Sequence, residues 1–344
     1  MNVKPTIVFL LLLTLSVQAQ QFKTPVDYLG YIGKETGTIA RSTWKYTTAV
    51  AHSKSARKID ATRKQLLKTM QLATKKIEAL KDGYQGDTEY RDQILTYLDL
   101  CEKQINQEYD KIINMQEVAE QSYDAMEAYV LMRDMVNNKL DQAQDALISH
   151  QKLFANKYNI HISEDTSELG KKMKISNEVF ENHTQLFLIF FRSNITETQL
   201  MMAIADKDLN AIQQNAAALQ SFSDQGLEKL KTFKAYKNDP MLVNATKKYL
   251  EFAKKEAIEL GSTTVTFMMN NQQLDEQKKV LEATAEKDRT REQIDNFNKL
   301  VNAANKEIGS YNRTNQKYNQ ERAAAIQNWN QNGTGFIAKH VPEN

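Results

Sequence analysis

The feature that most constrains this chain is its shortage of residues that interrupt helices. Only four prolines and eleven glycines occur in 344 residues, against ordinary usage of about 5% Pro and 7% Gly. Pro removes a backbone donor and Gly loses conformational entropy on folding, so both interrupt helices. Ala, Gln, Lys, Glu and Leu, which favour helices, are abundant. The sequence therefore predicts an all-α fold with long helices.

Apolar residues recur at helical spacing along most of the chain. One such row begins at Ile59, and Gly83 and Gly86 close its helix. Asp87 has the side chain of an N-cap and precedes a second row, so a new helix is expected there. We place the turn that ends this helix in the polar stretch 114–121.

Two start signals lie in the second half. Thr196 and Gln199 have the spacing of a capping box, and Asp239 is followed by Pro240, an N-cap before a first-turn proline. We expect a helix to begin at each. Further on, alternating spacings of three and four predict a heptad seam and coiled-coil packing. The seam contains Ile294, Phe297, Val301, Ala304, Ile308, Tyr311, Asn315 and Tyr318.

The two halves of the chain resemble each other. Residues 77–81 resemble 227–231 at an offset of 150, and 97–103 resemble 249–255 at 152. Lys157-Tyr158-Asn159 recurs as Lys317-Tyr318-Asn319 at an offset of 160. The order is kept and the offset is nearly constant, which favours an internal repeat. We expect two tandem, diverged units resembling four-helix bundles, over 20–166 and 167–330, and a flexible C-terminal tail over 331–344.

The N-terminus has the pattern of a secretory signal peptide. Lys4 precedes an apolar run, and small residues at Val17 and Ala19 predict cleavage that removes residues 1–19. The residue after the predicted cleavage site is Gln20, so the Cys of a lipoprotein is missing there. We expect export to the periplasm, the cell surface or the medium, without a transmembrane segment after cleavage.

Charge, cysteine and histidine content make several classes of partner and of chemical site unlikely. Lys plus Arg total 45 and Asp plus Glu 43, interspersed without a basic stripe, so no nucleic-acid partner is expected. The single cysteine, Cys101, excludes an intramolecular disulfide and is expected to be buried. None of the five histidines has the spacing of a metal motif, and nucleotide-binding glycine patterns are absent. We therefore expect no cofactor, no metal site and no enzymatic activity.

Short motifs resemble a known family. The signal sequence, a helix containing Tyr97-Leu98-Asp99, and a unit that closes on residues 154–159 (FANKYN) together resemble the helical "surface proteins" known from spirochaetes and Bacteroidota. The resemblance implies an exported, helical, bacterial protein. It supplies no activity and no catalytic residue.

Aromatic residues are the remaining candidates for ligand contact. Phe180, Phe187, Phe190 and Phe191 lie in a segment that is apolar on most faces. They are interpreted either as the buried core of the second bundle or as the lining of an apolar ligand pocket. The leading functional hypothesis is a non-enzymatic envelope or surface scaffold that contacts protein partners and is free to oligomerise. The alternative is a carrier that binds an apolar or small ligand inside a bundle.

Overall fold

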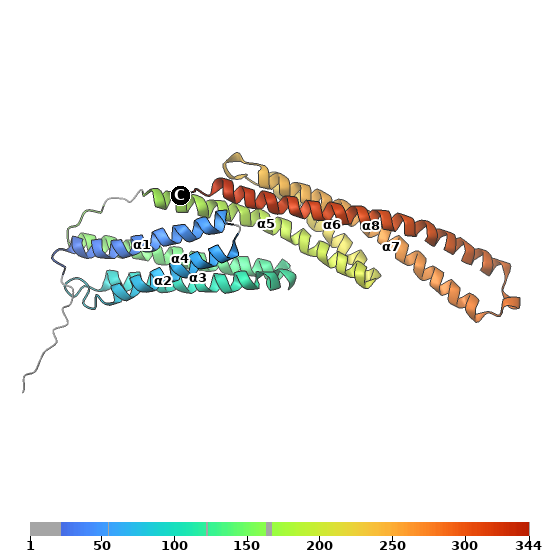
Figure 1. Ribbon diagram of the computed structural model, residues 1–344, viewed down its shortest axis with the longest axis horizontal. Helices are drawn as coiled ribbons and strands as arrows, with labels where there is room; N and C mark the ends of the chain where they lie inside the picture. Colours follow the sequence, from blue (N-terminus) through green and yellow to red (C-terminus); the bar gives the residue numbers. More distant parts are fainter. Residues whose placement is uncertain (1–21, 54, 122, 163–166, 344) are drawn as a thin grey trace, which may run out of the picture. The chain divides into compact units, whose positions relative to one another are not determined.

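The computed structural model describes residues 22–343 except 54, 122 and 163–166, and the described part is all-α (Figure 1). The predicted signal peptide, 1–19, lies outside the described residues. Two single-turn 3₁₀ helices, Tyr236–Asn238 and Glu286–Asp288, precede the last two long helices. The long helices are α1 (Pro25–His52), α2 (Ala56–Glu78), α3 (Glu89–Gln121), α4 (Tyr123–Lys157), α5 (Glu168–Asp206), α6 (Leu209–Thr232), α7 (Met241–Ala283) and α8 (Arg291–His340).

The described residues fall into two compact units. The predicted boundary at 166/167 lies between α4 and α5, with four long helices on either side. The compact units do not follow that boundary, because parts of α1 to α4 are assigned to the second one. Within the described residues, the first unit holds 22–43, 61–107 and 135–162, and the second holds 44–60, 108–134 and 167–343.

The core of the first unit is built around an aromatic cluster. Tyr28 is fully buried, and its ring lies 5.9 Å from Tyr84 and 5.3 Å from Phe154. Two helices, α1 and α4, and the turn after α2 therefore meet at one point. Aliphatic side chains at helical spacing continue this core, among them Ile32, Leu66, Met70, Ile77, Ile94 and Leu98.

The core of the second unit lies between α5, α6, α7 and α8. Leu186 and Leu200 of α5, Leu219 of α6 and Leu250 of α7 are fully buried. Gly226 of α6 permits close packing, since a Cβ there would lie 2.8 Å from a methyl group of Leu250. Burial of these aliphatic residues is the main source of stability in this unit.

The predicted flexible tail, 331–344, is incorrect. α8 continues to His340, and Phe336 and Val341 are almost fully buried. Gly333 lies inside the helix and lets it approach α5, because a Cβ there would come within 3.1 Å of His183 Nε2. Gly333 therefore makes room for close helix packing.

Candidate functional site

Of the four phenylalanines singled out from the sequence, Phe190 and Phe191 lie in the core of the second unit, and Phe180 and Phe187 pack against it. Phe190 is 4% exposed and Phe191 6% exposed. The ring of Phe190 stacks on Trp329 at 4.1 Å and lies 4.4 Å from Tyr249. These contacts join α5 to α7 and α8 through aromatic packing.

The other two phenylalanines are partly buried against the same core. Phe187 stacks on Phe191 at 5.4 Å and lies 5.9 Å from Trp329, and Phe180 packs at the edge of the cluster. Protein rings occupy the space around these residues. This packing favours their interpretation as core residues over a ligand pocket. A hollow that is open to solvent lies elsewhere, on α6, where Gln220, Asp224 and Gln225 line it.

A buried charge cluster next to this core was not foreseen from the sequence. Glu197 of α5 is 1% exposed, and Glu256 of α7 is fully buried. Both carboxylates form ion pairs with the guanidinium of Arg322, from α8. Tyr249 donates a hydrogen bond of 3.2 Å to Glu197, and Asn194 donates one of 3.2 Å to the Tyr249 hydroxyl. Two acids therefore share one cation inside the protein.

The charge balance of this cluster determines its protonation. Burial, and then the neighbouring Glu197 carboxylate, raise the pKa of Glu256 to about 8. Burial also raises the pKa of Glu197. One arginine cannot neutralise two ionised carboxylates in a desolvated site, so one proton is retained at neutral pH. The cluster is a proton-holding contact between three helices.

A sequence signal for this cluster was available. Along α7 the inward-facing row runs from Leu242 through Tyr249 to Leu260 at spacings of three and four, and Glu256 occupies one position of that row. An acid on a buried stripe requires a partner. The signal was hidden because this chain has 43 acids, most of which lie on solvated helix faces.

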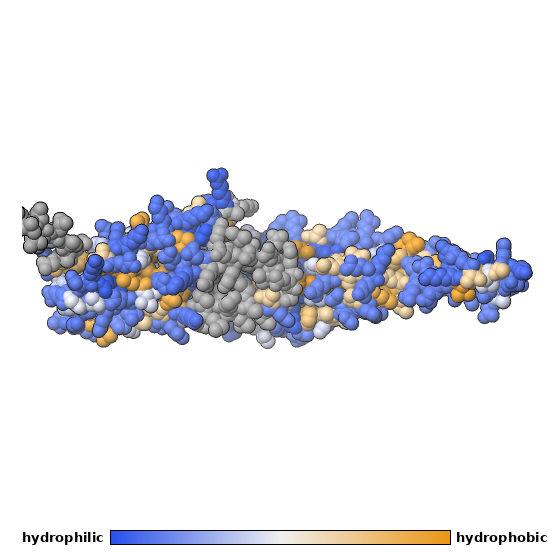
Figure 2. All heavy atoms as spheres, turned by 90° about the horizontal axis from the view of Figure 1, so that it is seen from below, coloured by the Kyte–Doolittle hydropathy of each residue, from blue (hydrophilic) through white to orange (hydrophobic). Residues whose placement is uncertain are grey.

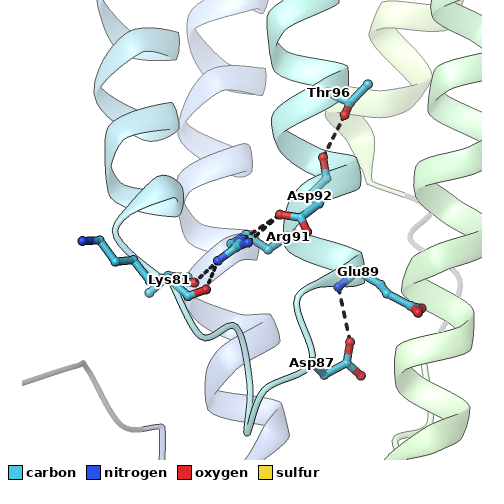
Figure 3. A network of polar contacts seen from close by, with 7 residues as sticks. Lys81, Asp87, Glu89, Arg91, Asp92 and Thr96 are labelled. Atoms are coloured by element: carbon cyan, nitrogen blue, oxygen red, sulfur yellow. Dashed lines mark hydrogen bonds and ion pairs between the residues drawn. The ribbon is translucent and has the colours of Figure 1, made fainter.

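The turn between α2 and α3 is the first part of a polar contact at one end of the first unit. Tyr84 and Asp87 exchange two backbone hydrogen bonds of 3.0 Å. Gln85 and Gly86, between them, both have positive φ, as the central residues of a type I′ turn do. Asp87 Oδ1 accepts a hydrogen bond of 3.3 Å from the backbone of Glu89, at the start of α3 (Figure 3). The turn thus presents a fixed carboxylate.

Arg91 holds the end of α2 against the start of α3. Its guanidinium donates to the carbonyl oxygens of Leu80 and Lys81, and also binds the carboxylate of Asp92 (Figure 3). Carbonyls after the last turn of a helix lack partners within that helix. Arg91 supplies donors for them and fixes the geometry of the turn.

The end of α4 completes this contact. Lys157 Nζ lies 2.8 Å from Asp87 Oδ2, and the Tyr158 hydroxyl donates to the same oxygen at 3.4 Å. The ring of Tyr158 meets that of Tyr84 edge-on at 5.0 Å, and Phe154 lies beneath both. We call Tyr84, Asp87, Phe154, Lys157 and Tyr158 the first clasp.

The second unit contains the same arrangement. Lys339 Nζ lies 2.7 Å from Asp239 Oδ2, and His340 Nε2 lies 2.8 Å from that oxygen. Tyr236 meets His340 edge-on at 5.3 Å, with Phe336 beneath both. We call Tyr236, Asp239, Phe336, Lys339 and His340 the second clasp.

The turns of the two clasps agree in backbone detail. Lys237 and Asn238 have positive φ, as Gln85 and Gly86 do. Asp239 Oδ1 accepts from the backbone of Met241 at the start of α7. The hydrogen bond from Lys339 is the largest of several causes that lower the pKa of Asp239 to about 2, so this carboxylate is ionised at neutral pH. Turn residues of the second clasp follow those of the first by 152 positions, and helix-end residues by 182.

The outer parts of α7 and α8, residues 262–311, form a feature that we call the arm. Figure 1 shows both helices continuing side by side beyond the turn that joins α5 to α6. Phe267 and Tyr311 stack between them at 4.6 Å. Other apolar side chains remain outside this contact, and Figure 2 shows orange patches on the hydrophilic surface at that end of the view. The most exposed are Met269, Val280, Ile294 and Ile308, at 42–45%.

Comparisons with known proteins add no assignment. None of the protein-family models, curated proteins or solved structures compared with the chain matches it. Over the described residues, no helix is long and apolar enough to cross a membrane. Within that same part of the chain, no group of three His, Cys, Asp or Glu residues is placed to hold a metal ion.

Proposed function

We propose that this chain is an exported, non-enzymatic helical scaffold that contacts protein partners through the arm. The observation that carries the proposal is the exposure of Met269, Val280, Ile294 and Ile308 on two helices that bury only the row between them. Each helix of a pair can cover only one stripe of its neighbour. Exposed apolar side chains that gather in one patch mark sites of protein contact, whereas a single exposed apolar residue does not.

The buried charge cluster supports a structural role for the rest of the second unit. Glu256 and Glu197 are enclosed, and their partners are Arg322 and Tyr249 of the same unit. A catalytic acid or base must reach the proton that it transfers. These carboxyls instead bind side chains of neighbouring helices, Tyr249 of α7 and Arg322 of α8, which fits a scaffold whose helices must keep their register.

We further propose that the segments α1–α4 and α5–α8 arose by duplication. The two clasps share a Tyr-x-x-Asp turn with two positive φ values, a Phe-x-x-Lys-aromatic helix end, and the same pattern of bonds to one carboxylate. Chance similarity between Lys-rich helices does not explain matched turns, bonds and ring contacts together. The duplication is compatible with the resemblance to the helical surface proteins.

Export rests on the N-terminal pattern of Lys4, the apolar run and Ala19. We propose that residues 1–19 are removed and that the remaining chain acts in the envelope, at the surface or in the medium. N-terminal sequencing of the protein recovered from its own source checks this. Gln20 at the N-terminus is expected, whereas an intact Met1 would contradict the proposal.

Photo-crosslinking in the native host tests the proposed function. A photo-reactive amino acid is placed at exposed Asn305 in the arm, with a control at Met202 of α5, which is 62% exposed. Light-dependent adducts of discrete mass are expected at 305 and not at 202. Equal labelling at both positions, or no adduct at 305, would refute the proposal that the arm is a contact site.

A further inference from the structure

One face of α8 carries an uncharged strip along the arm. Its residues alternate spacings of four and three, and they are Ile294, Asn298, Val301, Asn305, Ile308, Asn312 and Asn315. At this spacing they lie on one side of the helix. The chain is 26% charged, yet none of these seven residues carries a charge.

The strip lies beside the row that α8 turns towards α7. That inward row includes Ala304, which is 3% exposed, and Tyr318, which is fully buried, together with Tyr311 stacked on Phe267. Strip residues are more open, with Ile294 at 43% and Ile308 at 42% exposed. Of the predicted heptad seam, one row therefore faces α7, and the other row is more exposed.

We infer that a second copy of this chain covers the strip, with the two α8 helices antiparallel. This inference rests on the proposed function, since it names the partner of the arm. A two-fold interface requires a surface that is complementary to itself. The strip meets that requirement because Ile294 and Ile308 lie seven residues before and after Val301. Antiparallel pairing centred there places Ile294 of one copy beside Ile308 of the other.

The asparagines are also arranged for self-pairing. Asn298 lies three residues before Val301 and Asn305 four residues after it. In the same antiparallel pairing, Asn298 of one copy comes beside Asn305 of the other. An amide both donates and accepts hydrogen bonds, so it pairs with another amide without any complementary charge. Like charges at these positions would instead repel the two copies.

The chemistry of the strip disfavours partners of other classes. A nucleic acid or an anionic membrane surface requires cations, and a charged protein surface requires charges of opposite sign. A membrane interface also requires an uninterrupted apolar face, whereas here every second residue of the strip is Asn. From 294 to 315 the strip spans about 30 Å of helix.

Charge complementation tests this inference directly. One variant carries Asn298→Lys and Asn305→Lys, and a second carries Asn298→Glu and Asn305→Glu. Lys and Glu favour helices more than Asn does, and the far-UV circular dichroism spectrum of each variant checks that its fold is kept. Sedimentation equilibrium of the chain from residue 20 onward then measures association. Met202→Lys on α5 is the matched control.

We expect a dimer for the unmodified chain and for Met202→Lys. The double-Lys variant and the double-Glu variant should each associate at least about 100-fold more weakly, because like charges would face each other. An equimolar mixture of the two variants should recover a mixed dimer. A monomeric unmodified chain would overturn the inference, and so would a double-Lys or double-Glu variant that dimerises as strongly as the unmodified chain. The crosslinker at Asn305 separates the two proposals. An adduct of twice the chain mass supports both, whereas an adduct with a different protein keeps the proposed function and overturns the second copy.

Discussion

Replacing Glu256 with glutamine should remove a pH dependence from the stability of the second unit. Glu256 is fully buried, and its pKa is raised from 4.5 to about 8. Between these two values the folded protein holds a proton that the unfolded chain releases. The free energy of unfolding therefore falls as pH rises through this range, and the contribution is fully present only below about pH 4.5.

The size of the effect follows from the shift. Each pKa unit corresponds to about 1.36 kcal/mol, so the unmodified protein should lose about 4 kcal/mol between pH 5 and pH 9 from this group alone. Glu256→Gln cannot ionise, and its amide oxygen still accepts from Arg322. The variant should match the unmodified protein within about 1 kcal/mol near pH 5 and exceed it increasingly towards pH 9.

Denaturant titrations followed by tryptophan fluorescence measure this difference. The chain has two tryptophans, so a Trp44→Phe background leaves Trp329, whose ring stacks on Phe190 beside Tyr249, as the reporter. Other titrating groups cancel when the variant is subtracted from the parent. Glu259→Gln is the control, because the Tyr318 hydroxyl lowers the pKa of Glu259 and this group stays ionised throughout the range. Parallel curves for Glu256→Gln and its parent would refute the assignment.

Three further predictions concern the same unit. Gly333→Ala should destabilise the unit by about 1–2 kcal/mol, because the new Cβ would crowd His183. Gly335→Ala should stabilise the unit by about 0.5–1 kcal/mol, because its Cβ would meet only an ordinary contact at 3.8 Å. Thermal melts of the two variants measure both effects. Burial lowers the pKa of His183 from 6.5 to about 4. The free energy of unfolding of the parent should therefore fall by about 2.6 kcal/mol as pH falls from 6.5 to 4, and titrations of His183→Gln should lack this loss. His340→Tyr should change the free energy of unfolding by less than about 1 kcal/mol, since the first clasp has Tyr at the matching position. Asp239→Asn should instead lower it by about 1–3 kcal/mol. Equal denaturant midpoints for the two variants would contradict the proposed role of Asp239 in the second clasp.

Local chemistry made the helices predictable. A shortage of Pro and Gly, together with apolar rows at helical spacing, is a property of each segment alone, and the all-α prediction is confirmed. Asp87 accepts from the backbone at the start of α3, and Asp239 does the same at the start of α7. The turn expected over 114–121 is incorrect because α3 continues to Gln121, and polar composition alone does not end a helix.

Other signals misled because their meaning depends on tertiary packing. Thr196 and Gln199 have capping-box spacing, yet both lie inside α5, where the Thr196 hydroxyl donates to the carbonyl of Arg192. A capping box acts only where the chain enters the helix from a non-helical conformation, as Thr290 and Gln293 do at the start of α8. No local pattern shows that α5 continues through this point, which is fixed by the burial of its apolar side chains.

The location of the arm follows from the proposed duplication. Sequence comparison matched Lys157-Tyr158 with Lys317-Tyr318, but the clasps match it with Lys339-His340 instead. Similar residues along long helices allow a comparison to slip, whereas bonds at the helix ends fix the register. With the clasps as anchors, α7 and α8 have 43 and 50 residues where α3 and α4 have 33 and 35. The second unit therefore has extra helix between its anchored ends, and that extra length extends α7 and α8 past α5 and α6. The strip from Ile294 to Asn315 lies at this outer end of α8. The extra helix length, which α3 and α4 lack, is therefore also the part proposed to bind a partner.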